Sequence, residues 1–208
     1  PKQKEAGMMK LLYLIPAVLV MVLLSPVTEA HANWESRGTE KGVTVYTAPV
    51  SGSDVLKVKA VAIIDSPTPV VWAALTDPKF TVKGVQIKRR IGRCGGNCEY
   101  IYLRLGHWLL QDRHYVMKMT SVVVAAGEKS RYRRFWRKTN DKRVIGTGAI
   151  VVPKSSGSWN LRPIAGGKQT LITFINHLDL GGNVPASFFN SGFVSSTYEL
   201  IHRLRANT

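Results

Sequence analysis

Residues 177–190, HLDLGGNVPASFFN, combine residue types that could bind an anion. Gly181 and Gly182 follow an alternating apolar run, and Pro185 stands where a helix could begin. Backbone amides of glycines at a helix N-terminus can hold a phosphate or a carboxylate. Because only two glycines are present, a sharp turn from a strand into a helix is the simpler interpretation, and such a turn can require positive φ.

Arg113 is a second residue whose side chain could take part in a binding site, because it lies in an otherwise apolar strand between Asp112 and Tyr115. A buried guanidinium needs a carboxylate or a ligand oxygen, since an unpaired buried charge is costly. Two interpretations stay open. Arg113 contacts the head group of a ligand, or it forms a structural ion pair with Asp112, Asp179 or another acid.

The two cysteines of the chain, Cys94 and Cys98, stand in the sequence CGGNC. In an oxidising compartment this spacing can close a small disulfide ring at a hairpin turn. A zinc site would need paired Cys or His ligands, and a thioredoxin-like C-x-x-C motif is one residue shorter. We therefore predict a disulfide and no metal site.

Residues 129–143, KSRYRRFWRKTNDKR, carry eight basic side chains with three aromatic ones among them. Basic and aromatic side chains together suit an anionic membrane interface or single-stranded nucleic acid. A charged edge strand that resists aggregation has the same pattern. We predict no nucleic-acid binding and take as membrane-surface residues Arg133, Arg134, Trp136, Arg137 and Lys138.

Motifs of common enzyme classes are missing from the sequence. There is no G-x-S-x-G, H-E-x-x-H, Walker loop or G-x-G-x-x-G. The histidines His107, His114, His177 and His202 are scattered along the chain. We expect neither catalysis nor a cofactor.

Residues 1–32 differ from the rest of the chain and are predicted to be upstream residues followed by a secretory signal peptide. Lys10 precedes an apolar run of about 14 residues, and Ala30-His31-Ala32 gives an A-x-A cleavage site before Asn33. An uncleaved membrane anchor is the alternative, although the run is shorter than the ~20 residues that span a bilayer. We expect export, cleavage after Ala32 and a periplasmic location.

The charge balance favours an anionic partner. The whole chain has a net charge of +16, and residues 33–208 keep 26 basic and 11 acidic residues, a net +15. For an exported protein, an acidic lipid surface or an anionic ligand is a more natural partner than nucleic acid. The oligomeric state stays open.

Periodicity predicts one α+β domain over residues 33–208, with a polar lead-in at 33–41. A helix capped by Ser66, with Pro67 in its first turn, ends at Pro78, and a long amphipathic helix begins at Pro185. Turn signals such as AGGK and SSGS separate the remaining segments. Alternation of apolar and polar residues predicts antiparallel strands over 43–50, 55–64, 85–93, 99–106, 109–124, 130–139, 158–163 and 168–180.

Three motifs, in order, resemble the START family of steroidogenic-acute-regulatory-related lipid-transfer domains, especially its small bacterial members. Residues 34–77 resemble the family's opening Trp, G-V-x-V-Y strand and Asp-x-Pro helix start. Residues 107–120 resemble its tryptophan stretch before D-R-D-F-V, with His114 in place of Asp. Residues 179–190 resemble D-P-G-G-x-[IL]-P-x-x-[LV]-x-N, with Leu180 in place of Pro.

The resemblance implies a helix-grip fold, in which a curved antiparallel sheet wraps around the C-terminal helix and encloses a tunnel for one lipid or sterol. A polyketide cyclase or aromatase on the same fold, and a basic membrane-surface protein without an internal ligand, are the alternatives. Further candidates for the tunnel wall are Trp72, Tyr100, Tyr102, Met119 and Phe188. The predicted ligand-binding residues are Arg113, Tyr115, Met117, Trp108, Phe174, Phe189, Phe193 and Tyr198.

Overall fold

The computed structural model describes residues 33–107, 110–125, 130–141, 143, 148–182 and 185–208. Residues 32–208 form one compact unit, and the predicted signal peptide lies outside the described residues. The elements are β1 (Glu35–Glu40), β2 (Val43–Val50), β3 (Ser53–Ile64), α1 (Thr68–Thr76), β4 (Val85–Arg93), β5 (Cys98–His107), β6 (Leu110–Val123), β7 (Tyr132–Lys138), β8 (Ile150–Val151), β9 (Lys154–Ile164), β10 (Gln169–Asp179) and α2 (Ala186–Ala206).

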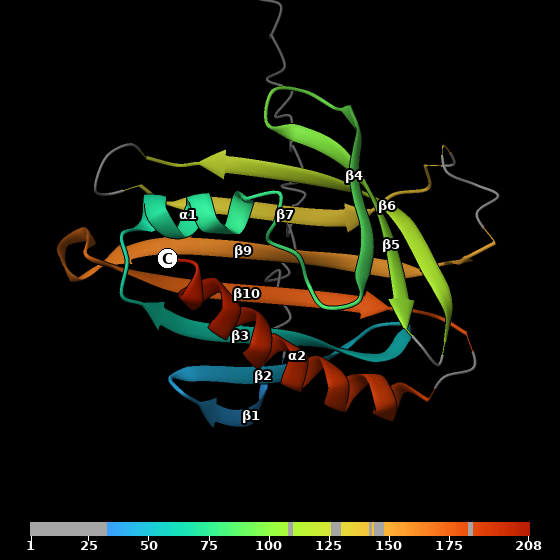
Figure 1. The fold of residues 1–208 in the computed structure, drawn as a ribbon. Coiled ribbons are helices and arrows are strands. Elements are labelled where there is room, and N and C mark those ends of the chain that lie inside the picture. Colours follow the sequence, from blue (N-terminus) through green and yellow to red (C-terminus); the bar gives the residue numbers. More distant parts are fainter. Residues whose placement is uncertain (1–32, 108–109, 126–129, 142, 144–147, 183–184) are drawn as a thin grey trace, which may run out of the picture. The chain divides into compact units, whose positions relative to one another are not determined.

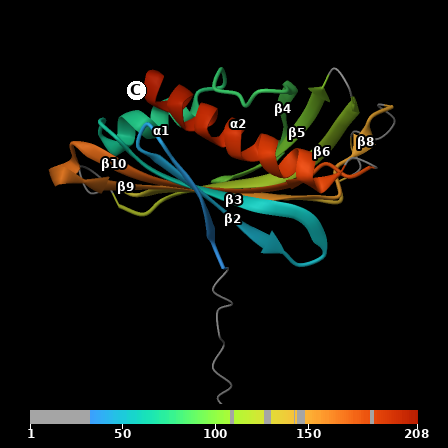
Figure 2. The ribbon, with the colours of Figure 1, turned by 90° about the horizontal axis from the view of Figure 1, so that it is seen from below.

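The described strands form one curved sheet in the order β1-β2-β3-β10-β9-β7-β6-β5-β4, with antiparallel neighbours along this path. The short strand β8 pairs with β6 in parallel. The last strand, β10, therefore returns to lie between β3 and β9 (Figure 1). Both helices lie on one side of the sheet, and β4 to β6 curl up beside α2 (Figure 2). The predicted helix-grip fold is confirmed.

Local structure departs from the sequence-based expectations in four places. The predicted lead-in at 33–41 contains β1, although its six residues are exposed as expected. The SSGS segment, predicted as a turn, lies inside β9, because long-range pairing with β7 and β10 overrides its turn chemistry. Pro67, not Ser66, stands at the N-cap of α1, and the Ser66 hydroxyl donates to the Thr208 carbonyl oxygen at 3.3 Å. The short strand β8 was not predicted.

The core divides into two clusters along the sheet. The larger one packs β2, β3, β9 and β10 against α1 and the C-terminal half of α2, where Ile201 and Leu204 are fully buried. Arg205 ties this half of α2 to the sheet, because its Nη2 donates to the Ile63 carbonyl oxygen at 2.9 Å. The smaller cluster lies on β5 and β6 around Leu103 and Met117, and Trp136 packs against both clusters. The N-terminal half of α2 is therefore the less tightly held half.

The predicted disulfide between Cys94 and Cys98 is present. It spans the turn between β4 and β5, where the Cys94 amide also donates to the Cys98 carbonyl oxygen at 3.0 Å. None of the helices in the described part of the chain has the length and apolarity needed to cross a bilayer.

Candidate ligand-binding site

A cavity of about 640 Å³ lies between the smaller core cluster and the N-terminal half of α2. Its size falls within the range of small-molecule sites. The sheet supplies one wall from β4, β5, β6, β7, β9 and β10, and α2 supplies the facing wall. Residues 80–85, which join α1 to β4, close a third side.

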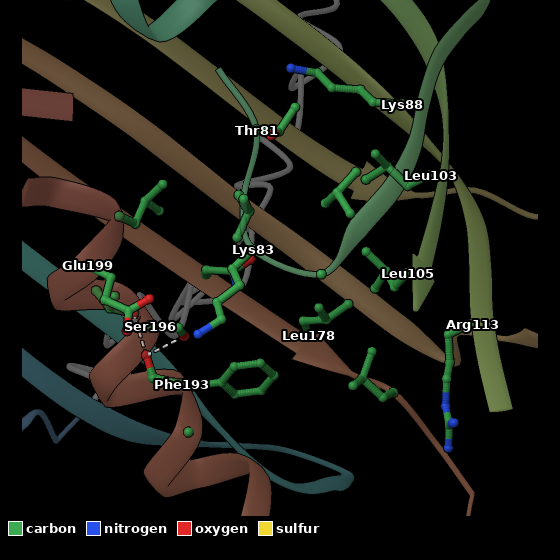
Figure 3. Close-up of a pocket in the computed structure, with 18 of the residues that line it drawn as sticks. Thr81, Lys83, Lys88, Leu103, Leu105, Arg113, Leu178, Phe193, Ser196 and Glu199 are labelled. Carbon is green, nitrogen blue, oxygen red and sulfur yellow. Dashed lines mark hydrogen bonds between the residues drawn. The ribbon is translucent and has the colours of Figure 1, made fainter. Parts of the chain in front are cut away.

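Apolar side chains make most of the cavity wall, and strand alternation explains how they reach it. Tyr115, Met117 and Met119 are alternate residues of β6 and all line the cavity, as do Phe174 and Leu178 of β10. Figure 3 shows the ring of Phe193 extending from α2 toward the sheet residues Leu178 and Leu105. The Phe193 ring also stacks on Phe189, with 6.2 Å between the ring centroids.

Six of the eight residues predicted to bind the ligand line this cavity: Arg113, Tyr115, Met117, Phe174, Phe189 and Phe193. Tyr198 is not among the lining residues. It is buried in the larger core cluster, and its hydroxyl approaches Gly38 of β1. Trp108 lies outside the described residues.

The further candidates for the tunnel wall also fall into residues that line the cavity and residues that do not. Met119 and Phe188 line the cavity. Tyr102 instead contacts the His114 ring edge-on at 6.0 Å between centroids, Tyr100 lies under the Arg143 guanidinium at 4.9 Å, and Trp72 stacks on Tyr132 at 5.0 Å. Since residue numbers alone do not say which face of a strand is internal, the sequence could not separate these two groups.

Several lining residues were missed by the sequence analysis. Asn176 lies between Phe174 and Leu178 on the inward side of β10, so continued alternation could have identified it. The segment 80–85 carries no periodic signal. It is held over the cavity by hydrogen bonds from Arg203 of α2 to the Thr81 carbonyl oxygen at 2.7 Å and from Lys88 to the Phe80 carbonyl oxygen at 3.2 Å.

Positive charge dominates the ionisable residues of the cavity wall. Lys83, Lys88, Arg113 and Arg134 line it, and Glu199 is the one acidic residue among the described lining residues. Burial lowers the pKa of Lys88, and the nearby Arg134 lowers it further. Burial raises the pKa of Tyr115 to about 12, so this phenol stays neutral.

The basic segment does not form the single membrane-facing surface that was predicted. It is not an edge strand either, because β7 lies between β9 and β6 inside the sheet. Its side chains alternate, so Arg134 and Trp136 line the cavity, which corrects their assignment as surface residues. Arg133 and Arg137 are exposed on the other face of β7, and Lys138 donates to Asn140 at 3.4 Å.

The turn between β10 and α2 has the predicted geometry. Gly181 and Gly182 both adopt positive φ, at 64° and 80°. The Gly181 amide donates to the Asp179 carboxylate at 3.0 Å, so this amide is already used within the turn. A phosphate-binding glycine loop is therefore not formed by Gly181.

Comparison with solved structures places this geometry in a known architecture. A STAR-related lipid transfer protein from Xanthomonas axonopodis superposes with a TM-score of 0.69, at 21% identity, over 83% of this chain and 97% of that one. Human StAR-related lipid transfer protein 5 gives a TM-score of 0.73, at 14% identity, over 84% of this chain and 85% of that one. The fold is that of a START domain.

Sequence comparison finds fewer relatives of this START fold than structural comparison does. No protein-family model matches the sequence. An uncharacterised protein of Pseudomonas aeruginosa, PA1579, is 26% identical over 179 residues, which cover 84% of this chain and 86% of that protein. Among the described residues of this START fold, no cluster of His, Cys, Asp and Glu side chains could hold a metal ion.

Proposed function

We propose that this protein binds one hydrophobic, lipid-like molecule in the cavity beneath α2 and transfers it to or from a membrane. The observation that carries the proposal is the 640 Å³ cavity, whose described wall is built mostly from apolar side chains of six strands and two helices. An apolar cavity with a few convergent polar groups is the usual form of a site for such ligands. The lipid transfer proteins that share the fold support this assignment.

The proposal is tested by comparing lipid retention between the unmodified protein and a variant whose cavity is filled by a mutation. Leu178→Trp places a large side chain in the cavity from β10, and Ile175→Trp places it on the same strand but on the face away from the cavity. The delipidated proteins are incubated with a defined lipid mixture and examined by native mass spectrometry. We expect the unmodified protein and Ile175→Trp to retain one lipid and Leu178→Trp to lose it. If the unmodified protein retains none, the proposal is wrong.

Ligand entry is proposed to use the N-terminal half of α2. Phe188 at its start is 54% exposed, whereas Ile201 and Leu204 near its end are fully buried. The rim opposite is residues 80–85, where Val82 is 45% exposed and Lys83 supplies a positive charge. An apolar and basic rim suits contact with an anionic bilayer.

Membrane association therefore has two candidate surfaces, which mutations can separate. The positive charge at the rim is reduced by Lys83→Gln together with Lys79→Gln, which lies next to the rim in the chain, and that of the outer face of β7 is reduced by Arg133→Gln with Arg137→Gln. Both pairs remove two charges. In flotation assays with vesicles of anionic phospholipid, we expect the rim pair to lose binding and the β7 pair to keep it. The opposite pattern would restore the original assignment of the outer basic surface.

We propose that binding is not accompanied by catalysis. His114, the residue on which a cyclase mechanism would depend, is not among the lining residues and lies on β6 between the inward-facing Arg113 and Tyr115. A cyclase would convert a poly-ketone substrate and lose activity in the His114→Ala variant. We expect no turnover of such a substrate by the unmodified protein.

We further propose export to the periplasm, on the basis of the sequence of residues 1–32. The Cys94–Cys98 disulfide is compatible with an oxidising compartment. Expression of the full chain followed by fractionation and N-terminal analysis is the test. The expected mature protein begins at Asn33, and Ala32→Arg is expected to block the cleavage. A cytoplasmic, uncleaved chain would refute export.

A further inference from the structure

Arg113 is a buried cation that has no acidic partner among the residues that the structure describes. Arg113 is only 5% exposed to solvent, and it lines the cavity. Its Nη1 donates to the Gln111 carbonyl oxygen, while Nε is buried without an acceptor. The first of two interpretations left open by the sequence, a contact with a ligand, is thus favoured over the structural ion pair.

Asp112 and Asp179, the two acids that the sequence suggested as partners of Arg113, form hydrogen bonds with other residues. Asp112 accepts hydrogen bonds from Arg104 Nε and Nη2, both at 2.8 Å. Asp179 accepts from the Ser53 hydroxyl at 2.7 Å and from the Gly181 amide. Within the described residues, no carboxylate forms a salt bridge with Arg113. A buried guanidinium in this state is stabilised by an anion that enters the cavity.

The surroundings of Arg113 place that anion at one end of the cavity. A Cβ at Gly182 would lie 3.3 Å from Arg113 Nη2, so the turn before α2 packs against the guanidinium. Figure 3 shows Arg113 at the edge of the group of lining residues, beside the segment that leaves β10. From Arg113 the inward row of β6 continues with Tyr115, Met117 and Met119. Six residues of strand span about 20 Å, enough for a long apolar tail.

We propose that the ligand is an amphiphile with an anionic head group, a carboxylate or a phosphate monoester, which pairs with Arg113 while its chain lies along Tyr115, Met117 and Met119. The guanidinium geometry suits two-pronged binding of either oxyanion. A neutral sterol or triacylglycerol would leave Arg113 unpaired. This inference rests on the proposed lipid-binding function and names the ligand class of the same cavity.

The experiment compares matched head groups on one chain length. Binding of palmitate, methyl palmitate, hexadecyl phosphate and cholesterol to the delipidated protein is measured by calorimetry. We expect palmitate or hexadecyl phosphate to bind about tenfold or more tightly than methyl palmitate, the range expected for a hydrogen-bonded ion pair. The two acids distinguish a carboxylate site from a phosphate site.

Arg113→Met removes the charge and keeps an unbranched side chain. We expect this variant to bind palmitate and methyl palmitate equally well. Arg133→Met, which removes an exposed cation on the outer face of β7, is the control and should keep the preference. If Arg113→Met does not fold, Gln111→Glu serves instead, because it adds a competing carboxylate at the residue whose carbonyl oxygen already accepts from Arg113.

The outcomes separate this inference from the proposed function. If none of the four compounds binds, both are overturned. If methyl palmitate or cholesterol binds as tightly as the acids, or if Arg113→Met keeps the preference for an acid, only the anionic ligand is overturned and lipid binding stands.

Discussion

The indole ring of Trp136 occupies the space that a side chain at Gly157 would need. The two residues are paired across β7 and β9, and a Cβ at Gly157 would lie 2.2 Å from Trp136 Cζ2 and 2.5 Å from the Ile175 carbonyl oxygen. Trp136 thereby lies over Gly157 of β9, packs against both core clusters and lines the cavity. A glycine on one strand thus sets the position of a cavity wall supplied by another.

Gly157→Ala is therefore expected to destabilise the protein and to alter the cavity. The added methyl group must displace either the indole or the backbone of β10, and overpacking of this kind typically costs about 1–3 kcal/mol. Denaturant unfolding measures the loss. Gly96→Ala is the control, because a Cβ at Gly96 meets nothing within 4 Å. Equal stability of the two variants would contradict the role assigned to Gly157.

Gly182→Val is expected to impair ligand binding and to lower stability. Gly182 has a φ of 80°, which a β-branched residue adopts only with strain of about 1–3 kcal/mol, and its Cβ would press on Arg113 Nη2. Gly192→Ala provides a comparison on α2, where a Cβ meets nothing within 4 Å. Binding and thermal unfolding of both variants test this. Inorganic phosphate alone should show no specific binding to the unmodified protein at this turn.

Asn190→Ala is expected to speed up ligand exchange. Its side chain fastens the N-terminal half of α2 to β3, accepting from the Leu56 amide at 2.9 Å and donating to the Asp54 carbonyl oxygen at 3.4 Å. Loss of these bonds is worth about 1 kcal/mol and favours movement of this half of the helix. Stopped-flow release of a fluorescent fatty acid measures the rate. Asn207→Ala, which removes a bond to the Arg203 carbonyl oxygen at the far end of α2, should leave the rate unchanged.

Stability is expected to fall as the pH is lowered below about 6.5, the ordinary pKa of histidine. Burial lowers the pKa of His177, and the same cause lowers that of His114. The unfolded chain therefore binds more protons than the folded chain in this range, so acid favours unfolding. His177 is buried, and its Nε2 lies 3.1 Å from the Val55 carbonyl oxygen.

Urea unfolding at pH 7.5 and pH 5.5 checks this expectation. The unmodified protein should show a lower midpoint at pH 5.5. The His177→Leu variant is less stable at pH 7.5, because it loses the contact with Val55, but its midpoint should change less between the two pH values. An identical pH dependence in both proteins would show that His177 does not contribute.

Local sequence patterns determined most of the elements of this protein. Alternation predicted β2 and β4 with their observed bounds, and the apolar stripe after Pro185 predicted α2. The CGGNC spacing predicted the disulfide, and the adjacent glycines predicted the positive-φ turn. These features depend on interactions between residues that are close in the chain, so local sequence patterns are sufficient to predict them.

Tertiary structure alone decided which face of each strand borders the cavity and what each charged residue pairs with. In β7, alternation separates Arg134 and Trp136 from Arg133 and Arg137, but only the position of β7 between β9 and β6 turns the first pair toward the ligand. In the described part of the chain, Arg113 forms no ion pair, because Asp112 and Asp179 accept hydrogen bonds from Arg104 and Ser53 instead. Residues 80–85 reach the cavity through hydrogen bonds to distant residues. Such pairings depend on long-range chain topology, which local periodicity does not encode.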